Sequence, residues 1–319
     1  MQSMTSPLLF LVLGLVLLFF GGEGLVRGSA ALALRLGLTP LVVGLTVVAF
    51  GTSAPELVVS VEAALNGHGA IAIGNVIGSN IFNIGLILGL TAILFPLKVQ
   101  LQILRIDAVI MVGVSLLAAW MLADLRIGRI EGAMLLAGLI AYTTFTVLFA
   151  KKVKSSAEVE AEFAEANPAP RGSVWRDLLF IVGGLALLIA GSRFFVEGAV
   201  SLARNFGVSE AVIGLTIIAA GTSMPELVTC IVAALKKEPD IALGNIVGSN
   251  IFNVLGILGA AALAKPMVGP GIKMLDLYVA VAFALALMPI LWSRFKIERW
   301  EGGLLLAGYI GYVAWLWPK

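Results

Sequence analysis

The sequence predicts an all-α integral membrane protein whose ten transmembrane helices form two inverted five-helix repeats. Three observations predict this fold class. First, the chain is 60% hydrophobic and only 13% charged, whereas soluble domains contain about 25% charged residues. Second, apolar runs recur from Leu8 to Trp317, each near the ~20 residues that a helix needs to cross a bilayer. Third, the chain contains an internal duplication.

The duplication is clearest at residues 51–83 and 221–253, which are identical at 20 of 33 positions without a gap. Weaker similarity continues outward, and it pairs 42–53 with 212–223 and 130–142 with 300–312. We therefore expect one membrane domain made of two repeats, 1–150 and 175–319, joined by a solvated linker at 151–174.

Each repeat is expected to contain five membrane spans. In the first repeat the apolar runs cover 7–34, 38–65, 70–95, 104–122 and 130–150, and in the second they cover 175–204, 209–235, 240–264, 274–292 and 300–317. The first residues lack the basic region of a signal peptide, so we expect them to begin the first membrane helix. Because five is odd, the second repeat enters the membrane from the opposite side, as in inverted-repeat transporters.

Lysine and arginine in the short loops indicate the orientation. Most of these residues, including Lys151, Lys152 and Lys154 at the start of the linker, fall on one predicted side of the membrane. Positively charged loops stay in the cytoplasm. We therefore expect a plasma (inner) membrane protein with a cytoplasmic 151–174 loop and both termini outside.

A first motif occurs once in each repeat, as GTSAPE at 51–56 and GTSMPE at 221–226. Proline inside a helix removes a hydrogen-bond donor and clashes with the carbonyl four residues earlier. Each motif is therefore expected to break its helix and to free a backbone carbonyl, that of Gly51 or Gly221. At membrane depth, protein, water or a cation must satisfy such a carbonyl.

The glutamates of this motif, Glu56 and Glu226, strengthen the prediction of a cation site. An ionised acid at the centre of a membrane costs about 2.5–3.5 kcal/mol on insertion scales. The alternative is that both glutamates lie near helix ends or pair with bases, but neither span has a lysine or arginine near its motif. We favour the reading in which the two broken helices supply one shared cation site.

A second motif follows in each repeat, as GNVIGSNIFN at 74–83 and GNIVGSNIFN at 244–253. Residues four apart share one face of a helix, so Ser79 lies beside Asn83 and Ser249 beside Asn253. Small polar residues also join helices without binding an ion, and this alternative applies above all to four asparagines: Asn75, Asn80, Asn245 and Asn250.

The two motifs together offer only oxygen ligands. These are the carboxylates of Glu56 and Glu226, the hydroxyls of Thr52, Ser53, Thr222, Ser223, Ser79 and Ser249, the amide oxygens of Asn83 and Asn253, and free carbonyls. Such a set suits Ca²⁺ or Na⁺ better than zinc or copper. The chain has one cysteine, Cys230, and one histidine, His68, which excludes an internal disulfide, a thiolate cluster and histidine-based zinc chemistry.

With these paired motifs, the chain resembles the calcium/cation antiporter superfamily, specifically its prokaryotic sodium/calcium exchanger-like branch. The resemblance implies ten helices, with ions held by the second, third, seventh and eighth, while helices one and six slide against the rest. It implies that Glu56 and Glu226 are the essential carboxylates and that Asn83 is a polar position of the central site. It further implies side-chain ligands at Ser53, Ser79, Ser223 and Ser249, and backbone-carbonyl ligands at Thr52, Thr222, Ala49 and Ala219.

One residue departs from this pattern. Some sodium/calcium exchangers carry an aspartate where this chain has Asn253, so the expected site holds two carboxylates and the counter-ion stays open. We predict a secondary antiporter that exchanges Ca²⁺ for Na⁺ by alternating access. The alternative is exchange of H⁺ for Ca²⁺, or for another divalent cation, on the same scaffold.

Other classes of function fit less well. An enzyme is not expected, because there is no G-x-S-x-G motif and no histidine cluster. A passive channel would leave the paired acids without a coupling role. The net charge of +2 does not favour nucleic acid. We expect no cofactor, a monomer in the lipid bilayer, and Ca²⁺ with Na⁺ or H⁺ as the bound ions.

The first and sixth spans carry a further pair of charges. Glu23 and Arg27 align with Arg193 and Glu197, which are the same charges in reversed order. They can act as an ion-entry or gating pair, or neutralise each other within each helix. We favour mutual neutralisation.

Overall fold

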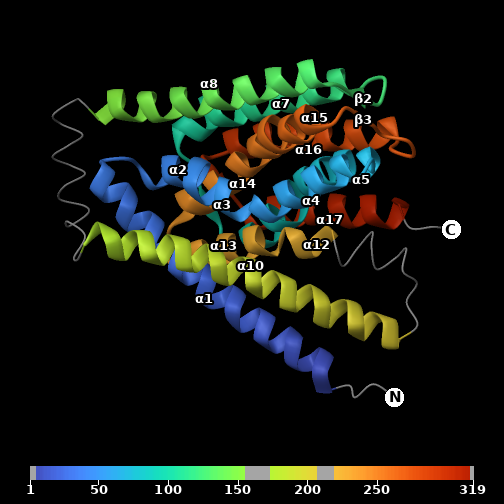
Figure 1. Cartoon of the computed structure of the whole chain (residues 1–319). Coiled ribbons are helices and arrows are strands. Elements are labelled where there is room, and N and C mark those ends of the chain that lie inside the picture. Colours follow the sequence, from blue (N-terminus) through green and yellow to red (C-terminus); the bar gives the residue numbers. More distant parts are fainter. Residues whose placement is uncertain (1–4, 155–172, 207–218, 317–319) are drawn as a thin grey trace.

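The fold is almost entirely helical (Figure 1). The computed structural model describes residues 5–154, 173–206 and 219–316. The first half contains α1 (Thr5–Leu36), α2 (Pro40–Val43), η1 (Gly44–Val48), α3 (Ala49–Thr52), α4 (Ala54–Leu65), α5 (Gly69–Phe82), η2 (Asn83–Leu88), α6 (Gly89–Leu94), β1 (Leu97–Lys98), η3 (Ile103–Asp107), α7 (Ala108–Met121), β2 (Arg126–Ile127) and α8 (Arg129–Lys154). The segments named η are π-helical.

The described part of the second half follows a similar order, but no π-helical segment precedes α16 as η3 precedes α7. It contains α10 (Val174–Asn205), α12 (Ala219–Thr222), α13 (Met224–Leu235), α14 (Pro239–Phe252), the π-helical η5 (Asn253–Leu258), α15 (Gly259–Ala264), β3 (Met267–Val268), α16 (Met274–Trp292), β4 (Lys296–Ile297) and α17 (Arg299–Leu316). Helices lie at the ranges expected for the spans, except that part of the predicted span 209–235 falls outside the described residues.

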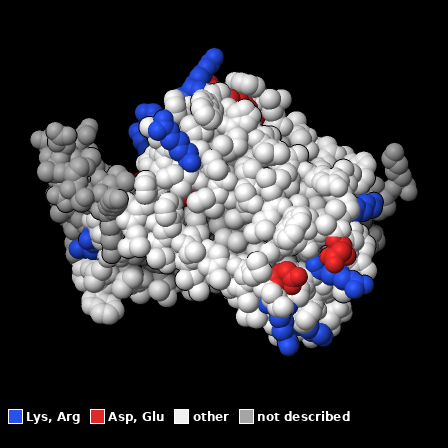
Figure 2. All heavy atoms as spheres, turned by 90° about the horizontal axis from the view of Figure 1, so that it is seen from above, with Lys and Arg blue, Asp and Glu red and all other residues white. Residues whose placement is uncertain are grey.

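Seven helices in the described ranges are long and apolar enough to cross a membrane. The pair Pro40–Thr52 and Ala54–Leu65, which bends by 47°, adds an eighth when the two parts count as one span. Met224–Leu235 is a shorter apolar helix. Figure 2 agrees with a membrane location, because a broad band without charged side chains separates the lysines and arginines at the two sides of the view.

Two helices form a layer of their own. α1 and α10 run obliquely beside each other along one side of the bundle (Figure 1). Glycines at intervals of seven residues allow the two backbones to touch: a Cβ on Gly21 would lie 2.8 Å from the backbone nitrogen of Leu188, and one on Gly191 would lie 2.8 Å from that of Leu18. Small residues at such an interface let membrane helices pack closely.

The remaining helices enclose the centre of the bundle. α14 is its most enclosed helix, since every residue from Ile241 to Phe252 is buried. It packs against η1, α3 and α13, while α4 packs against α5. The segments that carry both sequence motifs therefore meet in the middle of the molecule.

Two short antiparallel strand pairs connect the halves. β1 pairs with β4 and β2 pairs with β3. β1 and β3 occupy equivalent positions in the duplication, as do β2 and β4, so each strand pairs with the non-equivalent strand of the other half. The β2–β3 pair lies on the right of Figure 1, whereas α8 ends and α10 begins on the left.

Candidate cation site

Both GTS-x-PE motifs interrupt a helix, as the prolines predict. α3 ends at Thr52 and α4 begins at Ala54, with Ser53 between them, and α12 and α13 are separated in the same way by Ser223. The breaks place Glu56 and Glu226 in the first turns of α4 and α13. Only 2% of Glu56 and 1% of Glu226 is exposed, so neither glutamate lies at a solvated helix end.

Each glutamate bonds to the serine of the opposite half. Ser53 donates its hydroxyl to Glu226 Oε1 at 2.7 Å, and Ser223 donates to Glu56 Oε1 at 2.9 Å. Two further serines complete the cluster: Ser53 Oγ lies 3.1 Å from Ser249 Oγ, and Ser223 Oγ lies 3.4 Å from Ser79 Oγ. The two halves thus build one site, and residues about 170 positions apart hold each other in place.

Four of the oxygens that the sequence predicts as ligands are buried and have no hydrogen-bond partner among the described residues. They are Glu56 Oε2, Glu226 Oε2, Asn83 Oδ1 and Asn253 Oδ1. Leaving a buried acceptor unsatisfied costs about 1–3 kcal/mol, and more when it is charged. A bound cation satisfies several such oxygens at once, so this arrangement fits a cation with oxygen ligands.

The number of acids limits the charge that the site can balance. In the described part of the chain, no group of three or more His, Cys, Asp or Glu residues could hold a metal. The acids in the hydrogen-bonded cluster are Glu56 and Glu226, and the serine oxygens bonded to them are neutral.

The two asparagines with free oxygens lie at matching backbone positions. Asn83 begins the π-helical segment η2, and Asn253 begins η5. π-Helical turns often occur at functional sites. Asn253 also donates its Nδ2 to Asn80 Oδ1 at 2.9 Å, and Asn80 donates to the carbonyl of Asn250 at 3.2 Å. Asn80 thereby fixes the amide of Asn253 with its oxygen left unbonded.

Two other asparagines of the second motif join helices, which is the alternative to ion binding that the sequence leaves open for them. Asn75 donates to Ser60 Oγ at 2.9 Å and to the carbonyl of Glu56 at 3.3 Å. Asn245 accepts a hydrogen bond from Thr52 Oγ1 at 3.1 Å and donates to the sulfur of the buried Cys230 at 3.4 Å. These contacts hold α5 against α4 and α14 against α3 and α13.

The residues implied as backbone ligands lie on the broken helices. The carbonyl of Ala49 accepts from Ser53 N at 3.1 Å and from Thr52 Oγ1 at 3.4 Å. Ala219 and Thr222 begin and end α12, and only the backbone of Ala219 is described.

One of the carbonyls that the prolines free already has a partner. Ser192 of α10 donates its hydroxyl to the carbonyl of Gly221 at 2.5 Å. The carbonyl of Gly51 accepts from the backbone N–H of Ser53, and no side chain in the described ranges donates to it. Sequence reasoning missed Ser192, because its equivalent in the first half is Gly22 and the duplication therefore gave no signal.

The charged residues of the first and sixth spans have partners that the sequence does not predict. Glu23 bonds to Lys236, which follows α13, at 2.9 Å, and Arg27 lies over the ring of Phe180 at 5.1 Å. Within the described residues, neither Glu23–Arg27 nor Arg193–Glu197 forms an ion pair. For α1 the expectation of mutual neutralisation therefore misses the main partner of Glu23, which is Lys236, although the charge of Arg27 also acts on Glu23.

Comparisons with known proteins show the family of this chain. The family described as "Sodium/calcium exchanger protein" matches residues 6–148 and 177–317. "Putative antiporter CaxA" of Alkalimonas amylolytica is 41% identical over 308 residues, which cover 95% of this chain and 96% of the relative. "Sodium/calcium exchanger MaX1" of Methanosarcina acetivorans is 32% identical over 345 residues, covering 97% and 98%.

Two further relatives support the same assignment. "Inner membrane protein YrbG" of Escherichia coli is 36% identical over 309 residues, covering 96% of this chain and 94% of the relative. A solved structure of the sodium-calcium exchanger NCX_Mj superposes with a TM-score of 0.84 at 33% identity, covering 98% of this chain and 99% of that one. The chain therefore belongs to the sodium/calcium exchanger family of the calcium/cation antiporter superfamily, whose members are multi-pass membrane transporters and not enzymes.

Proposed function

We propose that this chain exchanges Ca²⁺ for Na⁺ across the membrane by alternating access. The four buried, unbonded oxygens on Glu56, Glu226, Asn83 and Asn253 are the observation that carries the proposal. Two carboxylates balance the charge of one Ca²⁺, and the surrounding neutral oxygens complete the six to eight ligands that Ca²⁺ takes. The similar proteins MaX1 and NCX_Mj, both named as sodium/calcium exchangers, support this choice of ions.

The ions are held by side-chain and backbone oxygens from both halves. The proposed side-chain ligands are Glu56, Glu226, Ser53, Ser223, Ser79, Ser249, Asn83 and Asn253, and the proposed carbonyl ligands are Thr52, Thr222, Ala49 and Ala219. The burial of both glutamates supports an occluded state, closed to both sides. Competing ions share the two glutamates, so binding one set of ions excludes the other.

The proposed architecture consists of ten spans in two inverted repeats. The strand pairs support it, because β1 with β4 and β2 with β3 bring non-equivalent loops to the same side. Repeats of parallel orientation would bring equivalent loops together. We further propose the repeat boundaries 1–150 and 175–319, a cytoplasmic 151–174 loop, both termini outside, and a monomer as the working unit.

The proposal is tested with the purified protein in proteoliposomes. We expect Ca²⁺ uptake when internal Na⁺ flows outward and pH is held equal on both sides. Uptake should stop when choline or K⁺ replaces internal Na⁺. Uptake that ignores Na⁺ and follows an imposed pH gradient would instead identify H⁺ as the coupling ion.

A further inference from the structure

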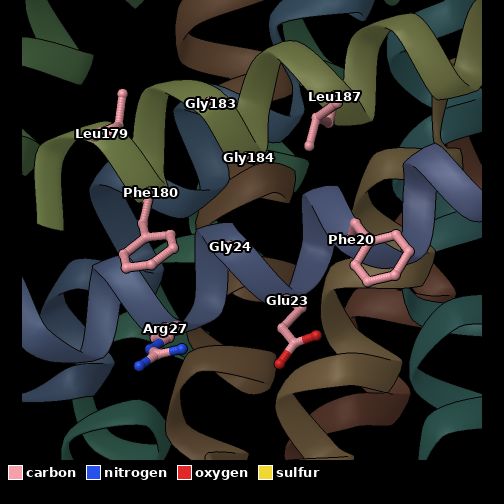
Figure 3. A pocket seen from close by; sticks show the side chains of 9 residues that line it. All are labelled: Phe20, Glu23, Gly24, Arg27, Leu179, Phe180, Gly183, Gly184 and Leu187. Carbon is pink, nitrogen blue, oxygen red and sulfur yellow. The ribbon is translucent and has the colours of Figure 1, made fainter. Parts of the chain in front are cut away.

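A groove lies between α1 and α10 (Figure 3), and none of the residues that line it belongs to the candidate cation site. It has a volume of about 350 Å³. Glu23 and Arg27 project from the same side of α1, and the ring of Phe180 reaches toward Arg27 from α10 (Figure 3). Phe20 is 55% exposed and Leu179 is 71% exposed, so the rim of the groove is apolar and open to the surroundings of the protein.

Arg27 forms no salt bridge in the described structure: the charge of nearby Glu23 acts on it only through space, because the Glu23 carboxylate is bonded to Lys236. The acids on α1 and α10 are Glu23, Asp177 and Glu197. Glu23 is bonded to Lys236 and Asp177 to Arg35. Glu197 lies more than four turns along α10 from Phe180. The contact with Phe180 uses the charge of the Arg27 guanidinium and leaves its N–H groups available as donors.

The charges beside the groove do not cancel. Arg27 and Lys236 are two cations, and Glu23 is one carboxylate, so the group has a net charge of +1. A lone arginine at the lipid-facing side of a membrane helix is costly unless it reaches an anion or the interface. An anion that accepts the N–H donors of Arg27 removes this cost.

The position of Arg27 along α1 indicates that this anion is a lipid phosphate. Lys236 directly follows the end of α13, and its amine lies 2.9 Å from Glu23 Oε1. Arg27 lies one turn beyond Glu23 toward the end of α1 at Leu36, about 10 Å from the middle of that helix. The hydrocarbon half-thickness is about 15 Å, so an extended arginine side chain reaches the phosphate level of one leaflet.

We propose that this groove binds an anionic phospholipid, with its phosphate on the Arg27 guanidinium and an acyl chain along Phe20, Leu179 and Leu187. Arginine binds phosphate oxygens through paired N–H donors, and basic pockets between membrane helices suit anionic head groups. The lipid then lies against the seam between α1 and α10.

The test measures lipid binding to the delipidated full chain in neutral detergent by native mass spectrometry. The probes are short-chain phosphatidylglycerol and phosphatidylcholine. We expect phosphatidylglycerol to bind wild type about tenfold more tightly, and Arg27→Gln to remove this preference. Arg193→Gln, which removes an exposed arginine of the same helix pair outside the groove, should retain it.

A second variant fills the groove without touching its charges. A Cβ at Gly183 would meet no atom within 4 Å, so Gly183→Leu should fold normally and lower the binding of phosphatidylglycerol at least tenfold. Gly311→Leu adds the same side chain to another open position and should bind as wild type does. The elution profile and unfolding temperature without lipid report folding.

Several results would overturn the proposal. These are equal binding of the two lipids by wild type, unchanged preference in Arg27→Gln, and unchanged binding in Gly183→Leu. Inorganic phosphate that displaces phosphatidylglycerol at equal concentration would identify a site for free phosphate and not for a lipid. If Arg27→Gln does not fold, Gly183→Leu decides the matter alone.

Discussion

The two halves of the cation site are alike in their glutamates and different in their supports. Ser53 bonds to Glu226 and Ser223 bonds to Glu56 at similar distances. Each half therefore binds the glutamate of the other half in nearly the same way. The broken helices that carry them are held differently. In the described residues, α12–α13 is bonded to the α1–α10 pair by polar contacts, and α3–α4 is not.

Two contacts make this difference. Ser192 of α10 donates to the carbonyl of Gly221, and Lys236 after α13 bonds to Glu23 of α1. Their equivalents in the duplication are Gly22 and Asn66. Duplication therefore preserved the groups that face the site, whereas the contacts behind them diverged. If α1 and α10 slide, these are the polar contacts that the movement must break.

The largest expected effect tests the equivalence of the glutamates. Glu56→Gln and Glu226→Gln should each weaken Ca²⁺ binding about 100-fold, because each removes one of two charges, worth about 3 kcal/mol. Equilibrium binding of radioactive Ca²⁺ measures this. Glu62→Gln, at an exposed position on α4, is the matched control. A variant of either site glutamate that binds Ca²⁺ like wild type would remove it from the site.

The second largest effect concerns the glycines through which α1 and α10 touch, a feature that both halves share. Gly21→Leu and Gly191→Leu should each lower the free energy of unfolding by about 3 kcal/mol, because the new Cβ meets the backbone of the facing helix at 2.8 Å. Thermal unfolding in detergent measures the loss. Gly183→Leu is the control, since its Cβ meets nothing within 4 Å. Strongly unequal losses at Gly21 and Gly191 would show that the interface is not symmetric.

The third effect probes the asymmetric support. Ser192→Ala should destabilise the protein by about 2 kcal/mol, because it leaves the buried carbonyl of Gly221 without a donor. Ser29 of α1 is also fully buried, but its hydroxyl has no partner among the described residues, so Ser29→Ala should cost nothing. Unfolding temperatures compare the two. Equal losses would mean that the Ser192 bond does not support the break.

The smallest effect separates two asparagines at equivalent positions. Asn80→Ala should weaken Ca²⁺ binding about fivefold, because Asn80 orients the amide of Asn253, and one hydrogen bond contributes about 1 kcal/mol. Asn250→Ala should change binding less, since the side-chain atoms of Asn250 have no hydrogen bonds in the described structure. Calcium titrations of both variants decide this. The reverse order would show that Asn80 does not position Asn253.

Local patterns explain how much the sequence predicted. The apolar runs and the polar residues between them placed most spans within one or two residues where the structure describes them, as for Pro239–Ala264 and Met274–Trp292; α8 is an exception, because it ends at Lys154, four residues beyond the expected position 150. The breaks before Pro55 and Pro225 were predictable too, because proline acts on its own helix. The burial of the two glutamates followed from their place within those runs.

Partners across the bundle were not predictable in this way. No sequence pattern pairs Lys236 with Glu23 or Ser192 with Gly221. For Glu23, the reasonable expectation was Arg27, which lies only four residues away in the sequence. Such contacts depend on the crossing of α1 with α10 and on the position of α13 beside them. The same is true of Asn80, whose motif was visible but whose bond to Asn253 was not.

The sequence by itself determined that this is a helical membrane protein with a duplicated, acid-bearing motif, because helix length, helix breaks and repeats are local properties. Only the tertiary structure decided which oxygens meet. It brought Ser53 to Glu226 and Ser223 to Glu56, and it left Oε2 of both glutamates and Oδ1 of Asn83 and Asn253 unbonded. The physical reason is that burial and hydrogen bonding between residues so far apart are set by the packing of whole helices.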